Sequence, residues 1–123
     1  MVGVNKDLAL VFTEAIKVAP IDFGIPEFGG LRTAEEQFEL HRRGSSPNCD
    51  GYETLSNHQS GNALDFYAYV DGKASWDKIH LAMVAATIMT TANRLGIELR
   101  WGGQFGSAIF HGWDMPHIEV LVQ

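Results

Sequence analysis

Two histidines and two aspartates stand in sequence contexts that suit metal chemistry. His58 precedes Asp65 in the segment Ser-x-His-x-x-Gly-x-Ala-x-Asp, and Asp114 precedes His117 near the C-terminus. Two histidines, one carboxylate and an open fourth position are typical of a catalytic zinc site, whereas structural zinc sites are usually rich in cysteine. The chain has a single cysteine, Cys49. We therefore interpret His58, Asp65 and His117 as ligands of a catalytic Zn2+ ion, with water in the fourth position.

The segment that contains Asp65 is otherwise apolar. Residues 63–70 are nearly all apolar or aromatic, which predicts a central strand. Gly61 and Asn62 suit a turn that feeds this strand, so His58 lies just before it and Asp65 within its start. A buried charge is costly unless it is paired or bound to a metal. On this segment alone, a salt bridge from Asp65 to an arginine, or a turn cap, remains an alternative to metal binding.

The second histidine lies at the start of a predicted final strand. Pro116 helps to fix the turn before residues 117–122, and His117 and Glu119 share one face of that strand. Asp114 lies shortly before His117 and can reach the same point in space without being a ligand. Glu119 either orients a ligand through a hydrogen bond or is a surface carboxylate, and the pattern leaves both open.

Helical periodicity predicts three helices that must support these segments. Thr33 and Glu36 form a capping box for the second helix, and Gly44 ends it. Ser75 can cap the third helix, which Gly96 closes and which we expect to be buried on much of its circumference. The predicted helices cover residues 6–19, 34–43 and 76–95.

Short strands and loops connect the helices. We expect further strands at 21–25 and 97–101, with a glycine-rich loop over 102–112. The resulting class is α+β, with a small, mainly antiparallel sheet and packed helices in a single domain that spans residues 1–123.

The bulk composition excludes several functional classes. The chain has 123 residues, of which 46% are hydrophobic and 20% charged, as is ordinary for a soluble globular protein. The net charge of −6 argues against binding to nucleic acid, which normally requires a basic patch. No run approaches the roughly 20 apolar residues that a membrane-spanning helix needs, so no membrane insertion is expected. The first residues also lack the pattern of a cleaved signal peptide.

The motifs together resemble the M15 family of zinc peptidases. Members include D-alanyl-D-alanine dipeptidases and carboxypeptidases, and phage endolysins that are L-alanyl-D-glutamate peptidases. The second motif is the Asp114 and His117 pair, and Arg32 with Gln37 matches an arginine segment of the family. The stretch 100–103, Arg-Trp-Gly-Gly, resembles the endolysin branch. The first motif is complete and consists of Ser56, His58, Gly61, Ala63 and Asp65.

This resemblance extends over about residues 8–121 and implies roles for individual residues. It implies that Asp114 is the general base and that Arg32 stabilises the oxyanion together with zinc. Ser56 is expected to hydrogen-bond within its loop or to substrate rather than to act as a nucleophile. Gln37 is expected to brace Arg32 or the loop, and Trp113 to pack near the cleft or to contact substrate.

The resemblance also implies a substrate and a setting. We expect a hedgehog/DD-peptidase-like fold and hydrolysis of the L-alanyl–D-glutamate bond in the stem peptides of peptidoglycan. A D-alanyl-D-alanine peptidase is the nearest alternative, and a non-catalytic zinc-binding cell-wall module is a second. We further expect a monomer without a separate cell-wall-binding domain, made in the host cytoplasm and released to the wall through a membrane pore. Residues 104–111 lack the acidic stretch that endolysin-type members often carry, which leaves calcium regulation open.

Overall fold

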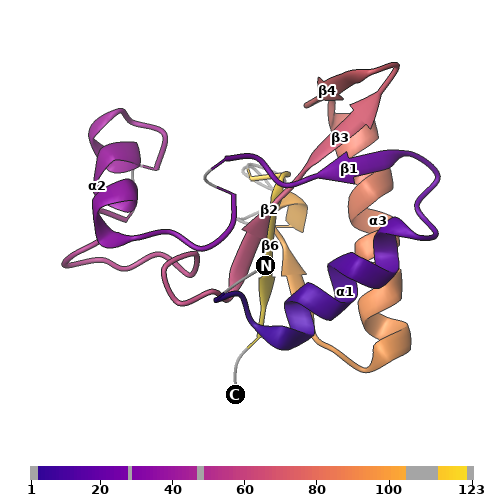
Figure 1. Ribbon diagram of the computed structural model, residues 1–123, viewed down its shortest axis with the longest axis horizontal. Coiled ribbons are helices and arrows are strands. Elements are labelled where there is room, and N and C mark those ends of the chain that lie inside the picture. The colour runs from indigo at the N-terminus through magenta and orange to yellow at the C-terminus, as the bar shows by residue number, and fades with distance from the viewer. Residues whose placement is uncertain (1–2, 28, 47–48, 105–113, 122–123) are drawn as a thin grey trace.

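A computed structural model of the chain describes residues 3–27, 29–46, 49–104 and 114–121. Three helices are interspersed with short strands, and all strand pairs are antiparallel (Figure 1). The predicted α+β class is therefore confirmed. In chain order the elements are α1 (Lys6–Ile16), β1 (Asp22–Gly24), α2 (Ala34–Arg42), β2 (Ala63–Asp65), β3 (Tyr67–Val70), β4 (Lys73–Ser75), α3 (Lys78–Leu95), β5 (Leu99–Trp101), the 3-10 turn η1 (Gly102–Gln104) and β6 (His117–Val120).

The strands form two small sheets rather than one. Their orders are β1-β3-β4 and β2-β6-β5. The predicted continuous strand over 63–70 is wrong, because the chain changes sheets at Phe66, which separates β2 from β3. The side chain of Phe66 is fully buried, and its backbone N–H donates to the carbonyl of Pro116 at 2.8 Å. Apolar character continued through the junction and therefore gave no sign of the break.

The start of α3 also differs from the prediction. Ser75 belongs to β4, which forms a hairpin with β3. The two turn residues, Asp71 and Gly72, have φ of 53° and 76°, as the preferred two-residue hairpin turns require. The helix is instead capped by Asp77, whose carboxylate accepts from the N–H of Ile79 at 2.9 Å. The Asp-Gly pair was the available signal for this hairpin.

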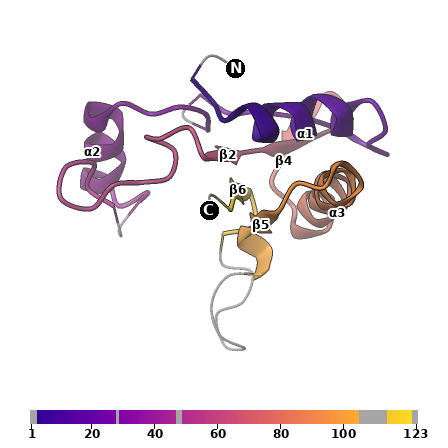
Figure 2. The same ribbon diagram turned by 90° about the horizontal axis from the view of Figure 1, so that it is seen from below.

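The hydrophobic core lies between α1, α3 and the two sheets. Figure 2 shows α1 and α3 side by side, with α2 at the opposite end of the molecule. Helix α3 buries one face only, since Ile79 and Met83 are 71% and 38% exposed, so the prediction of burial around much of the helix is wrong. The fully buried large side chains of the core are Leu8, Val11, Leu64, Phe66, Val84, Ile88 and Ile118.

Helix α2 stands apart from this core. Its predicted capping box is present, with the Thr33 hydroxyl accepting from the Glu36 N–H at 3.1 Å and the Glu36 carboxylate accepting from the Thr33 N–H at 2.9 Å. Only Gln37 of this helix is buried. Packing therefore contributes little to α2, and its caps and the bonds of Gln37 hold it in place. Among the described residues, no helix has the length and apolar character needed to cross a bilayer.

Candidate metal centre

Three side chains from two separate stretches of the sequence converge where β2 and β6 pair. Asp65 is the register partner of His117, and His58 lies in the turn before β2. The Nε2 atom of His58 is 3.3 Å from Asp65 Oδ1 and 3.3 Å from His117 Nδ1, and His117 Nδ1 is 3.4 Å from Asp65 Oδ1. The three donor atoms therefore form a nearly equilateral triangle.

This triangle matches one face of a zinc coordination tetrahedron. Zinc binds histidine nitrogen and carboxylate oxygen at about 2.0–2.1 Å, which places adjacent donor atoms of a tetrahedron about 3.3–3.4 Å apart. The three measured separations lie in that range. The donor set of two imidazoles and one carboxylate also suits zinc and leaves the fourth position open. The residues present therefore fit the ion that the sequence predicts.

His58 is oriented by the backbone of the loop that precedes α2. Its Nδ1 lies 3.2 Å from the carbonyl of Gly30, so a proton on Nδ1 leaves Nε2 as the ligand atom. The N–H of Arg32 donates to the carbonyl of His58 at 3.1 Å, which ties the same loop to the histidine turn. Ser56 accepts from the N–H of His58 at 3.2 Å through its hydroxyl. Ser56 thus lies in the loop and braces the backbone of the histidine.

His117 is oriented by a carboxylate on its own strand. Its Nε2 lies 2.8 Å from Glu119 Oε1, which leaves Nδ1 as the ligand atom. Glu119 Oε2 lies 3.6 Å from Arg100 Nη1 on the neighbouring strand β5. Burial lowers the pKa of His117, but hydrogen bonds and charge from Asp65 and Glu119 outweigh burial and raise it above its ordinary value. In the absence of metal, this ring therefore holds a proton more tightly than a free histidine does.

Asp65 uses its two oxygens for different partners. Oδ1 faces the two histidines, and Oδ2 accepts from Arg32 Nη2 at 3.1 Å. Metal binding and an arginine salt bridge were alternatives on the sequence alone, and the geometry allows both at once. Burial raises the pKa of Asp65, but the hydrogen bonds from His117 and His58 overcome it and hold the pKa well below its ordinary value. The group is therefore a carboxylate, as a metal ligand must be.

Arg32 is itself held by a buried glutamine. Its Nη1 donates to Gln37 Oε1 at 2.9 Å, and the Gln37 amide donates to Ser46 Oγ at 2.7 Å and to the carbonyl of Cys49 at 2.9 Å. Gln37 has no solvent exposure. Burial lowers the pKa of Arg32 and the nearby Asp65 opposes this shift, so the guanidinium remains a cation. A single chain of contacts therefore connects α2 to Asp65.

Asp114 lies beside the donor triangle without completing it. Its Oδ2 is 3.8 Å from His117 Nδ1, farther than the ligand atoms are from one another. Burial raises the pKa of Asp114 above its ordinary value, against the lowering effect of His117. A carboxyl group that is half-buried and adjacent to a metal site is suited to accept a proton.

A cleft of about 480 Å³ opens onto this centre. Three predicted site residues, Arg32, Asp65 and Asp114, lie in its wall. Trp113 lies outside the described residues. The sequence interpretation missed two backbone carbonyls. The Gly29 carbonyl accepts from the Asp65 N–H, and the Gly30 carbonyl faces Nδ1 of His58. The Gly-Gly pair next to Arg32 was the available signal that the backbone approaches the site here. The interpretation also missed other cleft residues, namely Pro26, Glu27, Leu40, Ser45, Trp76 and Pro116.

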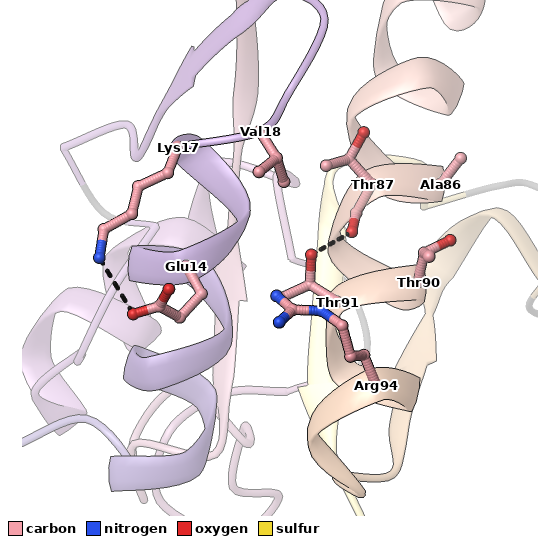
Figure 3. Close-up of a pocket in the computed structure, with 8 residues that line it drawn as sticks. All are labelled: Glu14, Lys17, Val18, Ala86, Thr87, Thr90, Thr91 and Arg94. Carbon is pink, nitrogen blue, oxygen red and sulfur yellow. Dashed lines mark hydrogen bonds and ion pairs between the residues drawn. The ribbon is translucent and has the colours of Figure 1, made fainter.

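A second hollow lies away from the metal centre. It is a groove of about 570 Å³ between α1 and α3, shown in Figure 3. Its walls carry an ion pair between Glu14 and Lys17 and the side chain of Arg94, with threonines along α3. None of the three candidate ligand residues lines it.

Comparison with known proteins places the chain in a family. A family model described as phage L-alanyl-D-glutamate peptidase matches residues 1–121. The chain belongs to this family. The prediction of a peptidase that resembles phage endolysins is thereby confirmed.

Individual relatives agree in sequence and fold. The L-alanyl-D-glutamate peptidase of Escherichia phage T5 is 29% identical over 126 residues, which cover 96% of this chain and 89% of the phage T5 protein. The crystal structure of the L-Ala D-Glu endopeptidase ChiX of Serratia marcescens has 31% identity and a TM-score of 0.80, over 97% of this chain and 81% of ChiX.

A more distant structure shares the fold alone. It is the vancomycin resistance D,D-pentapeptidase VanY from a VanB-type cassette, solved in complex with Zn(II). Its identity is 14% and its TM-score 0.66, over 97% of this chain and 73% of VanY. The expected DD-peptidase-like fold is therefore confirmed.

Proposed function

We propose that this chain is a zinc-dependent peptidase that hydrolyses the L-alanyl–D-glutamate bond in the stem peptides of peptidoglycan. The observation that carries the proposal is the triangle of donor atoms from His58, Asp65 and His117, with edges of 3.3, 3.3 and 3.4 Å. Membership of the phage peptidase family supports the choice of bond.

The proposed reaction assigns zinc to the three donor atoms. When bound, zinc lowers the pKa of a water molecule toward ~7 and polarises a carbonyl oxygen. His58 and His117 are presented as neutral ligands because Gly30 and Glu119 face their other ring nitrogens. Asp65 supplies the negative ligand, and its contact with Arg32 keeps Oδ1 directed at the histidines.

Asp114 carries the proton in this proposal. Water adds to the scissile carbonyl carbon, and its proton passes to the Asp114 carboxylate. The C–N bond then breaks, and Asp114 returns the proton to the departing D-glutamate amine, so that protons and charges balance. The raised pKa of Asp114 supports this role, because a base nearer to the working pH both accepts and returns a proton.

Arg32 supplies positive charge next to the reacting carbonyl. Its guanidinium is fixed by Asp65 and Gln37 and lies in the wall of the cleft. A preorganised cation stabilises the negative charge that develops on the carbonyl oxygen as water adds. Because the same guanidinium contacts Asp65, Arg32 also contributes to the geometry of the metal centre.

Peptidoglycan is the proposed partner, and a monomer the proposed state. The relation to a phage enzyme supports synthesis in an infected host cell and action on its wall after passage through a membrane pore. We also propose that residues 1–123 act as one domain.

The direct test is digestion of purified murein by zinc-loaded protein, followed by identification of the new amino termini. We expect D-glutamate amino termini. Release of D-alanine or its dipeptide, with the L-alanyl–D-glutamate bond intact, would instead establish the D-alanyl-D-alanine specificity.

A further inference from the structure

One end of the reaction cleft is built from residues that the proposed chemistry does not use. Glu27 and Trp76 line the same cleft of about 480 Å³ as Asp65 and Asp114. Glu27 is exposed, and Trp76 is 52% exposed. A carboxylate and an open indole face therefore border the path that a substrate takes beside the metal centre.

Strand pairing and side-chain contacts place these two residues at the same end of the β1-β3-β4 sheet, where Gly24 pairs with Tyr67 and Ser75 pairs with Ala68. The indole of Trp76 packs on the ring of Tyr67, with centroids 5.9 Å apart. The Tyr67 hydroxyl lies against Gly24, where an added Cβ would be 2.7 Å away. Gly24 ends β1, and Glu27 follows in the turn beyond it. The tyrosine thus bridges the tryptophan to the segment that carries Glu27.

The turn with Glu27 is also tied to a metal ligand. The N–H of Gly29 donates to the carbonyl of Pro26 at 2.9 Å, which closes the turn around Glu27. The carbonyl of Gly29 in turn accepts from the N–H of Asp65 at 2.7 Å. The backbone of the turn that carries Glu27 is therefore tied to the backbone of Asp65, which places this residue next to the metal centre.

Among the charged residues that line the cleft, Glu27 has no part in the proposed reaction. The charged residues in its wall are Glu27, Arg32, Asp65 and Asp114. The last three serve the metal and the reaction. Within the ranges that the structure describes, no salt bridge to Glu27 occurs. Its negative charge remains available to a cation brought by the substrate.

We propose that Glu27 and Trp76 form a subsite for a primary alkylammonium group, the side-chain amine of the diamino acid that follows D-glutamate in a stem peptide. This inference rests on the proposed function. With its N-terminus acylated, a stem peptide carries no other positive charge, and a carboxylate beside an indole face attracts an ammonium by ion pairing and by a cation–π interaction. An extended span of about three residues, roughly 10 Å, separates such an amine from the scissile bond.

The subsite would let the enzyme sense cross-linking. A free side-chain amine is charged, whereas an amine that has been acylated in a cross-link is neutral and bulkier. Glu27 and Trp76 therefore favour stem peptides whose diamino acid is still free. Because both groups are exposed, the preference should be moderate, about 3- to 10-fold in KM.

The test compares two synthetic peptides, N-acetyl-L-alanyl-γ-D-glutamyl-L-lysine and the same peptide with an Nε-acetylated lysine. For the zinc-loaded wild-type protein we expect a KM about 3- to 10-fold lower for the free lysine peptide. Glu27→Gln should abolish most of this difference in KM between the two peptides (the gap), and Trp76→Leu should reduce it. Glu35→Gln, a change to an exposed carboxylate on α2 outside the cleft, should leave the gap as in wild type.

The ratio of the two KM values is measured on the same preparation of each variant, so a partial loss of active protein does not affect it. Trp76→Phe keeps an aromatic face and should retain more of the gap than Trp76→Leu. Equal KM values for the two wild-type reactions, or an unchanged gap in Glu27→Gln, would overturn the subsite while leaving the peptidase assignment intact. Failure of wild type to cut either peptide at the alanyl–glutamate bond would overturn the proposed function as well.

Discussion

Each ligand of the candidate centre is fixed from its far side by a specific partner. Gly30 holds His58 through a backbone carbonyl, Glu119 holds His117, and Arg32 holds Asp65. Such partners set which atom faces the metal and how basic it is. Their contribution is separable from that of the ligands, because each can be altered without removing a donor atom.

Glu119 provides the first prediction at this scale. Glu119→Gln replaces the charged acceptor of His117 by a neutral one, so zinc affinity should fall about 10- to 100-fold. Competition with a chromophoric chelator measures this loss. Glu98→Gln, a change to an exposed carboxylate next to β5, is the matched control and should bind zinc as wild type does. Equal zinc affinity in the two variants would show that Glu119 does not contribute to metal binding.

The role of Asp114 is tested by separating metal from rate. Asp114→Ala should retain zinc and fold while losing about 10²- to 10⁴-fold in kcat, since a general base contributes that much. Metal content by elemental analysis and turnover on murein are measured on the same preparation. If zinc is lost together with activity, Asp114 is a ligand and the assignment of the base is wrong.

His117 makes the metal-free protein sensitive to pH. Its folded-state pKa is raised above the unfolded value of about 6.5, so its protonated form stabilises the fold. That contribution is complete below about pH 6.5 and is lost as pH rises through the folded pKa. In chelator, urea unfolding should show wild type losing its advantage over His117→Gln as pH is raised from 6 to 8. A difference that is constant or grows with pH would contradict this sign.

At the scale of elements, short turns place the ligands. The turn before β2 carries His58, and Gly61 within it has φ of 78°. A Cβ at Gly61 would lie 2.1 Å from the carbonyl oxygen of Gly3, whereas a Cβ at Gly72, with φ of 76°, meets nothing within 4 Å. The two glycines therefore separate the cost of a positive φ from the cost of a backbone clash.

Alanine substitutions at these two glycines should differ in effect. Gly72→Ala should cost about 1–2 kcal/mol in the free energy of unfolding, because only the left-handed conformation is strained. Gly61→Ala should cost more and should also weaken zinc retention, since relief of the clash displaces the turn with His58. Urea unfolding and zinc titration measure both effects. Equal losses in the two variants would show that the contact with Gly3 yields without cost.

Sequence reasoning predicted which residues gather at the candidate site more readily than it predicted the topology. Capping chemistry is local, so the box of Thr33 and Glu36 and the end of α3 at Gly96 could be predicted. The break at Phe66 could not, because it depends on which strands pair across the molecule. The three candidate ligands could be named because their residue types are rare in such contexts, and the structure brings their donor atoms together. The cleft residues Glu27 and Trp76 carry no such pattern and required the fold.

At the scale of the molecule, the centre lies between two parts with different construction. One part is the apolar core of α1, α3 and the sheets, and the other is α2 with its loops (Figure 1). Gln37 and Arg32 join the second part to the centre through hydrogen bonds. The wall of the cleft draws on both parts, since Leu40 and Ser45 belong to α2 and its loop, and Pro26 and Trp76 lie on the side of the sheets.

The separation of the ligands along the chain has a consequence for durability. His58 and His117 are 59 residues apart, and the chain has no disulfide because it contains one cysteine. An ion that joins them acts as a removable cross-link of the folded state: because the site does not exist in the unfolded chain, the free energy of metal binding adds to the free energy of unfolding. Metal loading then sets the rate at which proteases degrade the protein, as well as whether the protein is active. In a strong chelator the protein should therefore be degraded faster by added protease, whether or not any substrate is present.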